Sequence, residues 1–195
     1  MKKNSIVCLL ALVVVFSAHA QKNRTETLAE SISIQYKGKT VRAVKLSVSS
    51  EIPMSIDYVW GNVKTSDLLI YVTKGFTKLK PEGGAFPKLW SEGDTVYTRS
   101  KVFGFLPFGG IRSLFFETIS DSERIIQTRE WDKQIRVWDH KITLEPTSSN
   151  TTIYTDEIVI YAGGMTGFIT AFAKQFYKHR QKRWQQVAKE NLRFG

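Results

Sequence analysis

Two residues of the last predicted hairpin, His140 and Asp156, have the side chains best suited to proton transfer. They lie in the stretches VWDHKITL and TIYTDEIVIY, which alternate as strands do and are joined by a polar turn. If Leu144 pairs with Thr152, His140 lies directly opposite Asp156 on one face of the hairpin. Cross-strand neighbours on one face have Cβ atoms about 5 Å apart, which suits an imidazole–carboxylate hydrogen bond.

Such a pair can serve as a general acid–base couple, or its members can simply satisfy each other in a core. A carboxylate that accepts a hydrogen bond from an imidazole orients the ring for proton transfer. A change of one residue in the register would place the two side chains on opposite faces of the sheet. We therefore treat His140 and Asp156 as candidate catalytic residues that point into a cavity.

Arg99 and Arg129 are candidate ligand-binding residues because each is predicted to lie beside aromatic side chains. Arg99 shares a strand face with Tyr97 and Phe103, and Arg129 lies opposite Phe115 in a second predicted hairpin. An inward arginine among aromatic rings can bind a carboxylate or a phosphate. A surface ion pair with a nearby glutamate is the alternative.

The sequence lacks the motifs of metal and nucleotide chemistry. Its only cysteine, Cys8, lies in the apolar run near the N-terminus, and of three histidines only His140 and His179 lie beyond residue 20. No phosphate-binding loop, dinucleotide-binding fingerprint or nucleophile elbow occurs. We therefore expect no metal ion and no other cofactor.

Large aromatic side chains are candidates for the lining of a pocket. The stretch KVFGFLPFGG places four large apolar residues among glycines and a proline, which is unusual on a protein surface. It predicts a loop that is a cavity lid, a membrane-contacting tip or a buried segment. With the arginines included, the predicted ligand-binding residues are Trp60, Arg99, Phe103, Phe115, Arg129, Trp138, Tyr154, Phe168, Phe172 and Phe176.

One long helix near the C-terminus is the element around which the predicted strands must be arranged. Phe168, Phe172, Phe176, Trp184 and Val187 recur at helical spacing, and we expect them to form one apolar face. A face of this kind needs a sheet to cover it. The basic residues expected on the remaining helix surface are Lys174, Lys178, Arg180, Lys182 and Arg183.

The middle of the chain predicts two short helices and then a series of strands. A strand over 41–49 precedes the helices, for which Ser55 and either Thr65 or Ser66 are suitable N-caps. Strands and turns follow without the strand–helix alternation of a parallel sheet. This order predicts an antiparallel sheet in an α+β fold.

The first residues have the pattern of a secretory signal peptide. Lys2 and Lys3 precede an apolar run, and small residues lead to a predicted cleavage site after Ala20. We expect residues 1–20 to be removed on export to the periplasm or the cell exterior. A flexible segment over 21–40 and one domain over 41–194 are expected to follow.

The chain carries a formal net charge of +10, which cleavage of the two lysines with the signal peptide lowers to +8. This charge favours anionic partners, and for an exported protein these are membrane surfaces or glycans rather than nucleic acid. A helix face that is basic because it is solvated is the alternative.

Three stretches resemble the START-like (SRPBCC) superfamily, which includes polyketide cyclases and lipid-transfer domains. SSEIPMSIDYVW resembles its passage from strand to helix, and WDHKITLEP followed by TTIYTDEIVIYAGG resembles its last two strands. The glycine-rich start of the long aromatic helix is similar as well. The resemblance covers roughly residues 41–190 and implies a helix-grip fold, in which a curved antiparallel sheet and the C-terminal helix enclose a largely apolar cavity.

These observations favour an exported, non-enzymatic protein that binds or carries a hydrophobic or amphipathic small molecule, such as a lipid. One alternative is an enzyme similar to the polyketide cyclases, with His140 as the acid–base group and Asp156 as its partner. Another is a peripheral protein that binds anionic membrane surfaces through the basic helix and the 103–108 loop.

Overall fold

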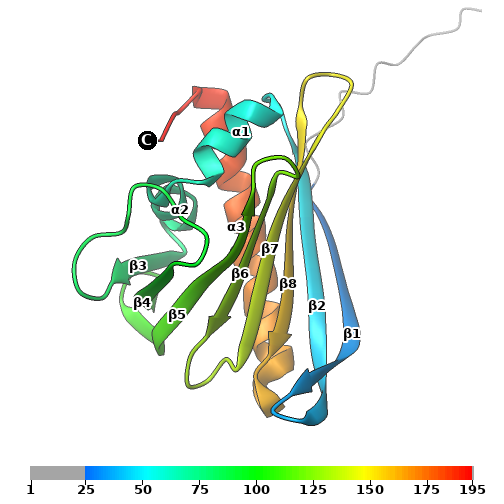
Figure 1. Ribbon diagram of the computed structural model, residues 1–195, viewed down its shortest axis with the longest axis vertical. Helices are drawn as coiled ribbons and strands as arrows, with labels where there is room; N and C mark the ends of the chain where they lie inside the picture. The colour runs from blue at the N-terminus through cyan, green and yellow to red at the C-terminus, as the bar shows by residue number, and fades with distance from the viewer. Residues whose placement is uncertain (1–24, 195) are drawn as a thin grey trace, which may run out of the picture.

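The computed structural model describes residues 25–194 (Figure 1). The strands are β1 (Glu26–Tyr36), β2 (Lys39–Ile52), β3 (Thr77–Pro81), β4 (Thr95–Val102), β5 (Leu106–Ser120), β6 (Ile125–Trp131), β7 (Val137–Pro146) and β8 (Thr152–Tyr161). The helices are α1 (Ile56–Val63), α2 (Ser66–Thr73) and α3 (Thr166–Glu190), with a short 3-10 helix, Gly163–Met165, before α3. The predicted signal peptide, residues 1–20, lies outside the described residues. Within them, no helix is long and apolar enough to cross a membrane.

The strands form a single antiparallel sheet in the order β1-β2-β8-β7-β6-β5-β4-β3. Figure 1 shows this sheet curving around α3, with α1 and α2 beside the C-terminal half of that helix. Each strand from β3 onward pairs with the next one along the chain, and β8 returns to pair with β2. The α+β helix-grip fold expected from the sequence is confirmed.

The two short helices begin where the sequence places their caps. The Ser55 hydroxyl accepts a hydrogen bond from the Tyr58 backbone N–H at 3.4 Å. The Thr65 hydroxyl accepts one from the Leu68 N–H at 3.2 Å. Each cap satisfies a helix N–H that has no partner within the helix, so these local signals fix where the helices start.

The buried face of α3 differs from the predicted aromatic stripe. Phe168 is 66% exposed, Phe172 and Phe176 are partly buried, and Arg180 lies in the interior instead of on the surface. At about 3.6 residues per turn, each step of four residues drifts by about 40° around the helix, so Phe168 and Trp184 lie about 160° apart and cannot share one face. The residues that α3 buries are Ile169, Ala173, Tyr177, Arg180, Gln181, Trp184, Val187 and Ala188.

The flexible segment predicted over residues 21–40 differs from the structure where residues are described, from 25 onward. Residues Glu26–Tyr36 form the edge strand β1, which pairs with β2 along its whole length. Both faces of β1 are largely exposed, and Leu28 is 65% exposed. The strand is therefore held mainly by its hydrogen-bond ladder, and its apolar alternation is confined to Ile32, Ile34 and Tyr36, which are partly buried.

The stretch KVFGFLPFGG forms a hairpin rather than a loop. Only residues 103–105 lie between β4 and β5, and the stretch after them belongs to β5. The register shifts beside Ser100, where Gly109 and Gly110 adopt left-handed φ values of 76° and 75°. Glycine tolerates this conformation, and the resulting bulge bends the strand so that Phe108 faces the interior side of the sheet.

The interior contains two apolar clusters that meet along the length of α3. One lies at the end of the sheet covered by α1 and α2, and it includes Ile52, Val59, Leu144, Tyr154 and Trp184. The other lies towards the start of α3 and includes Leu46, Val48, Trp138, Ile158 and Ile169. Polar residues of four elements are buried between the two clusters, at Ser50, His140, Asp156, Arg180 and Gln181.

Trp184→Ala should lower the free energy of unfolding by about 3–5 kcal/mol, because it removes a fully buried side chain from the core. Trp131 is the matched control, since it lies on the outer face of β6 and is 46% exposed. Its replacement by alanine should cost under about 1 kcal/mol. Chemical denaturation measures both values, and equal losses would contradict the placement of α3 against the sheet.

Candidate functional site

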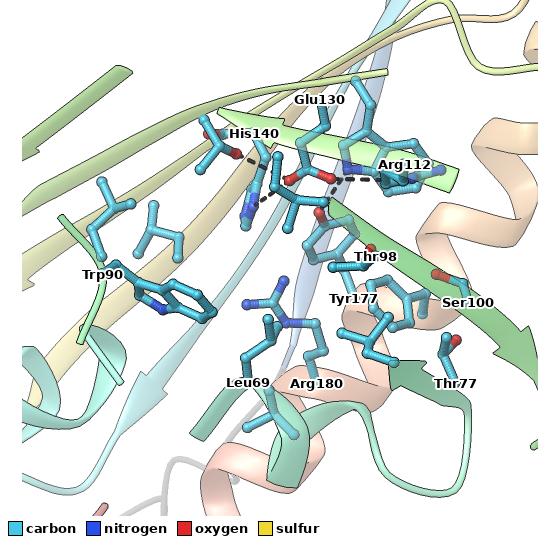
Figure 2. A pocket seen from close by; sticks show the side chains of 18 of the residues that line it. Leu69, Thr77, Trp90, Thr98, Ser100, Arg112, Glu130, His140, Tyr177 and Arg180 are labelled. Atoms are coloured by element: carbon cyan, nitrogen blue, oxygen red, sulfur yellow. Dashed lines mark hydrogen bonds and ion pairs between the residues drawn. The ribbon is translucent and has the colours of Figure 1, made fainter. Parts of the chain in front are cut away.

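A cavity of about 110 Å³ lies between the inner face of the sheet, α2 and α3 (Figure 2). Leu68, Leu69 and Val72 of α2 form one apolar wall, and Phe116 and Ile126 of the sheet belong to another. A cavity of this size is comparable with one that holds a benzene-sized molecule. Mostly apolar walls with a few polar groups are typical of small-molecule sites.

Stacked aromatic rings line one side of the cavity. The Phe172 and Phe176 rings are nearly parallel, with centroids 6.3 Å apart, and Phe108 stacks on Phe172 at 4.9 Å. Phe76 contacts both helix rings and also Phe103 on the β4–β5 hairpin. The partly buried rings thus connect the cavity to the exposed tip of that hairpin.

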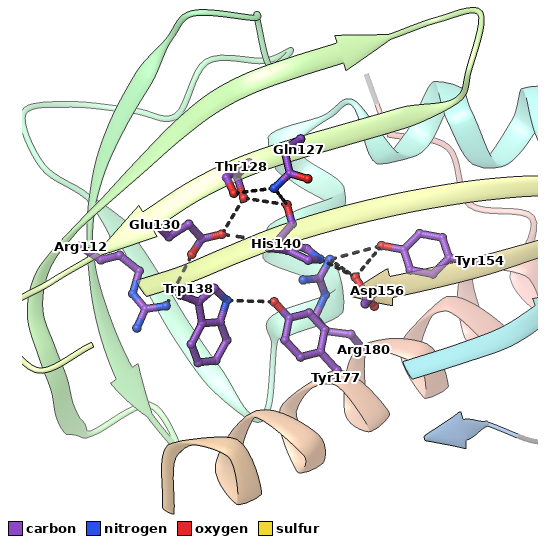
Figure 3. A network of polar contacts seen from close by, with 10 residues as sticks. All are labelled: Arg112, Gln127, Thr128, Glu130, Trp138, His140, Tyr154, Asp156, Tyr177 and Arg180. Atoms are coloured by element: carbon purple, nitrogen blue, oxygen red, sulfur yellow. Dashed lines mark hydrogen bonds and ion pairs between the residues drawn. The ribbon is translucent and has the colours of Figure 1, made fainter. Parts of the chain in front are cut away.

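The His140–Asp156 pair exists, although the strand register differs from the predicted one. His140 Nε2 lies 2.8 Å from Asp156 Oδ1 (Figure 3). Asp156 pairs with Ile142, and His140 pairs with Ile158. The register is displaced by two residues, and because side chains alternate with a period of two, both still lie on the inner face. His140 lines the cavity, whereas Asp156 is fully buried behind it.

The Asp156 carboxylate is surrounded by donors. Gln181 Nε2 donates to Oδ2 at 2.9 Å, the Tyr154 hydroxyl donates to Oδ1 at 3.3 Å, and Arg180 Nη2 lies 3.6 Å from Oδ1. Burial opposes ionisation, but the Arg180 charge and the His140 hydrogen bond outweigh it, so the pKa of Asp156 lies below its ordinary value. The carboxylate is therefore ionised and compensated inside the core.

A second carboxylate, Glu130, lies on the other side of His140. Its Oε1 is 4.0 Å from His140 Nδ1 and accepts a hydrogen bond from the Thr128 hydroxyl at 3.0 Å. Arg112 bridges Glu130 and Asp132, with N–O distances of 3.5 Å and 3.1 Å. A continuous polar belt thus crosses the inner face of the sheet from Asp156 to Arg112 (Figure 3).

Tyr177 joins this belt to the aromatic wall. Trp138 Nε1 donates a hydrogen bond to the Tyr177 hydroxyl oxygen at 3.1 Å. Burial raises the pKa of Tyr177 well above its ordinary value, so the hydroxyl keeps its proton. The Arg180 guanidinium lies 5.0 Å from the centre of the same ring, within the range of a cation–π contact.

Four of the predicted site residues line the cavity, namely Trp138, His140, Phe172 and Phe176. Trp60 and Tyr154 are instead buried in the core outside the lining. Asp156 does not line the cavity either, but it contacts the lining residues His140 and Arg180. The Trp60 indole N–H donates to Asp121 at 2.5 Å, which turns its ring towards the end of the sheet.

The other predicted ligand-binding residues lie away from the cavity. Arg99 and Arg129 are on the outer face, where they pair with Glu82 at 2.5 Å and with Glu117 at 2.8 Å. Phe115 lies opposite Arg129 as predicted, but on that outer face. Phe103 and Phe168 are 61% and 66% exposed. Hydrophobicity alone did not fix these faces, and the surface ion pairs named as the alternative for the arginines are what the structure contains.

Sequence reasoning missed Arg112, Glu130, Tyr177 and Arg180, all of which line the cavity. The period of two would have placed Arg112 with Leu114 and Phe116, which are buried on the inner face. Arg180 lies three residues after Tyr177 on the buried face of α3. Charged residues are usually exposed, so Arg112, Arg180 and Glu130 were not expected in the interior.

No three His, Cys, Asp or Glu side chains within residues 25–194 are grouped so that they could hold a metal ion.

Comparison with known protein families gives no match to a family model, and no curated protein matches the sequence. Solved structures do match. CalU16 from Micromonospora echinospora is 11% identical, with a TM-score of 0.56, 90% of this chain covered and 80% of that one. A START superfamily protein from Mycobacterium smegmatis is 10% identical, with a TM-score of 0.55, 76% of this chain covered and 99% of that one. The chain has the START-like helix-grip fold. At such low identity the likeness establishes the fold alone.

Asp156→Ala should lower the free energy of unfolding by about 3–5 kcal/mol at neutral pH, since it leaves the buried Arg180 without its carboxylate. The adjacent Glu157 is the control: it pairs with Lys45 at the surface, and Glu157→Ala should cost at most about 1 kcal/mol.

The effect of Asp156→Ala should also depend on pH. The folded-state pKa of Asp156 lies below the ordinary 3.8, so its contribution is present above that value and is lost as the pH falls through the folded-state pKa. The free energies of unfolding of the wild type and of Asp156→Ala should therefore converge as the pH falls. Denaturation curves from pH 7 to pH 2 measure this. A difference that does not change below pH 4 would show that the Asp156 charge is not what stabilises the fold.

Proposed function

We propose that this protein is an exported, non-enzymatic carrier or binding protein for a hydrophobic or amphipathic small molecule held in the cavity. The observation that supports this most is the combination of apolar and aromatic walls with a buried polar belt on one side. Likeness in fold to a START superfamily protein is consistent with ligand binding. The export part of the proposal rests on the pattern of residues 1–20.

Affinity would come mainly from removing apolar ligand surface from water. Burial of about 150 Å² at about 25 cal/mol per Å² contributes about 4 kcal/mol. The polar belt would orient the ligand, because a group that enters this side of the cavity must hydrogen-bond there or lose its hydration without compensation. The ligand best suited to this arrangement has an apolar body and one polar end.

A cyclase-like enzyme with His140 as its acid–base group is the alternative from a different class. It is favoured by the exposure of His140 to the cavity and by its 2.8 Å hydrogen bond to Asp156. Nε2 is used by Asp156, whereas Nδ1, 4.0 Å from Glu130 Oε1, is beyond hydrogen-bond distance and is the nitrogen that would have to meet a substrate. The Glu130 carboxylate beside Nδ1 limits the approach of a substrate to that nitrogen, which favours the carrier.

Binding to an anionic membrane surface is a second function that a separate observation supports. Lys78 lies directly opposite Lys101, and Lys80 lies opposite Arg99, on the outer face of β3 and β4. Like charges in cross-strand pairs destabilise a sheet; Glu82 compensates Arg99, and an anionic partner would relieve the lysines. Phe105, on the adjoining tip of the β4–β5 hairpin, is 73% exposed.

This surface replaces part of the basic helix proposed from the sequence. Arg180 is buried, and Arg183 donates to the Tyr71 carbonyl at 3.2 Å while its guanidinium lies 3.9 Å from the Tyr71 ring centre. Neither arginine is free to contact lipid headgroups. We define the docking surface as Lys78, Lys80, Lys101, Phe103 and Phe105.

Ser100→Trp should abolish ligand binding, because Ser100 lies on the cavity lining and an indole at this position would fill the cavity. Thr95→Trp is the control, since Thr95 is exposed on the outer face of the same strand. Native mass spectrometry would detect small molecules that co-purify with each form, and ligand-observed NMR with ethylbenzene would measure binding directly. An unchanged affinity in Ser100→Trp, or a wild type that binds nothing, would refute the carrier proposal.

Replacing Lys78, Lys80 and Lys101 together by glutamine should weaken binding to phosphatidylglycerol-containing vesicles by about 100-fold, at about 1 kcal/mol for each lysine near the surface. A variant with Lys37, Lys39 and Arg42 replaced by glutamine removes the same charge from exposed positions of the β1–β2 turn and of β2. That variant should bind nearly as the wild type does. Vesicle co-sedimentation at low and high salt measures the effect, and equal losses in both variants would mean that only net charge matters.

A further inference from the structure

Two of the side chains that line the cavity have a buried polar atom without any hydrogen-bond partner. These atoms are Arg180 Nε and Thr77 Oγ1, and the two residues are only 6% and 7% exposed. Buried polar atoms in folded proteins are nearly always hydrogen-bonded. Arg180 Nε can only donate, so the partner it lacks is an acceptor, which a ligand in the cavity can supply.

The geometry of Arg180 leaves this donor in place for a ligand. One end of the guanidinium is anchored, with Nη2 3.6 Å from Asp156 Oδ1 and 3.4 Å from the Tyr154 hydroxyl. In Figure 2 the guanidinium lies among the lining residues, between Trp90 and Tyr177. A side chain held in this way binds a further acceptor with little loss of conformational freedom.

Tyr177 supplies a second donor beside it. Its oxygen already accepts the Trp138 indole hydrogen at 3.1 Å, which leaves the hydroxyl hydrogen to be donated. No protein acceptor for that hydrogen occurs among the described residues. Tyr177 and Arg180 are three residues apart on one face of α3, and the Arg180 guanidinium lies 5.0 Å from the centre of the Tyr177 ring, so the two donors belong to neighbouring side chains of the cavity wall.

The charges around the cavity indicate which kind of acceptor fits. Arg112 and Arg180 contribute two positive charges, while Glu130, Asp132 and Asp156 contribute three negative ones. The two arginines and three carboxylates alone leave one negative charge in excess. A ligand carboxylate would add a second in a poorly solvated environment, whereas a neutral oxygen would not.

The walls indicate the shape of the rest of the ligand. Trp90 and Phe116 stack with their rings 4.8 Å apart, and Phe172 and Phe176 are parallel to within 8°. Flat aromatic walls favour a planar ring in offset or edge contact. The cavity volume of about 110 Å³ accommodates a single ring with a small substituent.

We propose that the cavity selects a neutral carbonyl compound, with an aromatic or similarly compact apolar body, whose oxygen accepts hydrogen bonds from Arg180 Nε–H and the Tyr177 hydroxyl. This proposal rests on the carrier function and specifies the chemical class of its ligand. A ketone, an ester or an amide meets the requirement, and a free carboxylate does not.

Three probes of similar size test this proposal by ligand-observed NMR or calorimetry on the folded protein. Acetophenone carries a neutral carbonyl group, benzoate carries an anionic one, and ethylbenzene has no acceptor. The wild type should bind acetophenone about 10- to 100-fold more tightly than ethylbenzene, as expected for hydrogen bonds that include a charged donor. Benzoate should bind more weakly than acetophenone at neutral pH.

Two conservative variants locate the effect. Tyr177→Phe keeps the ring and removes one donor, and Arg180→Lys keeps the charge opposite Asp156 and removes the Nε donor. Each should reduce the preference for acetophenone over ethylbenzene while ethylbenzene binding is retained. Tyr161→Phe, outside the cavity lining, should leave the preference unchanged. Circular dichroism establishes whether each variant is folded. If Arg180→Lys does not fold, the result for Tyr177→Phe decides whether the donors select the ligand.

The possible failures are distinguishable. If acetophenone and ethylbenzene bind equally well, water satisfies the donors and the ligand class is wrong, although the carrier proposal survives. If benzoate binds most tightly, the argument from charge is wrong. If none of the three probes binds, the proposed carrier function fails together with this inference.

Discussion

The need to compensate one buried carboxylate organises the interior of this protein. Asp156 is fully buried on β8, and an ionised carboxylate in such a position is tolerated only with opposite charge and several hydrogen bonds around it. His140 of β7 and Gln181 of α3 supply hydrogen bonds, and Arg180 of α3 supplies the opposite charge. The contacts join neighbouring strands to the long helix, so they set how far along the sheet α3 lies.

The polar belt also explains why the interior is divided. Apolar side chains occupy both ends of the space between α3 and the sheet, and the belt lies between them. Buried ion pairs contribute less to stability than apolar residues of similar volume would, so retaining a belt of this kind is consistent with a role in specificity. Here the belt turns polar atoms towards a cavity whose other walls are apolar, as in sites that bind one oriented ligand.

The cavity and the hairpin tip belong to one region of the molecule. Phe76 contacts Phe172 and Phe176 on the cavity side and Phe103 on the tip. If the cationic strand face and the exposed tip dock onto a membrane, this aromatic series would connect the lipid surface with the cavity. Ligand binding and membrane binding are therefore compatible functions of the same end of the sheet.

The sequence by itself determined the local elements and the shared face of His140 and Asp156. Ser55 and Thr65 cap their helices through contacts within one turn, and the two-residue period of a strand keeps both catalytic candidates inward despite the displaced register. Only the tertiary structure decided which face of α3 is buried, because the four-residue spacing drifts around the helix and the sheet covers the side with Tyr177 and Trp184 rather than the side with Phe168. It also decided that Arg180, Glu130 and Arg112 lie inside. A charged residue in a sequence indicates a surface, and only partners brought from distant strands make its burial possible.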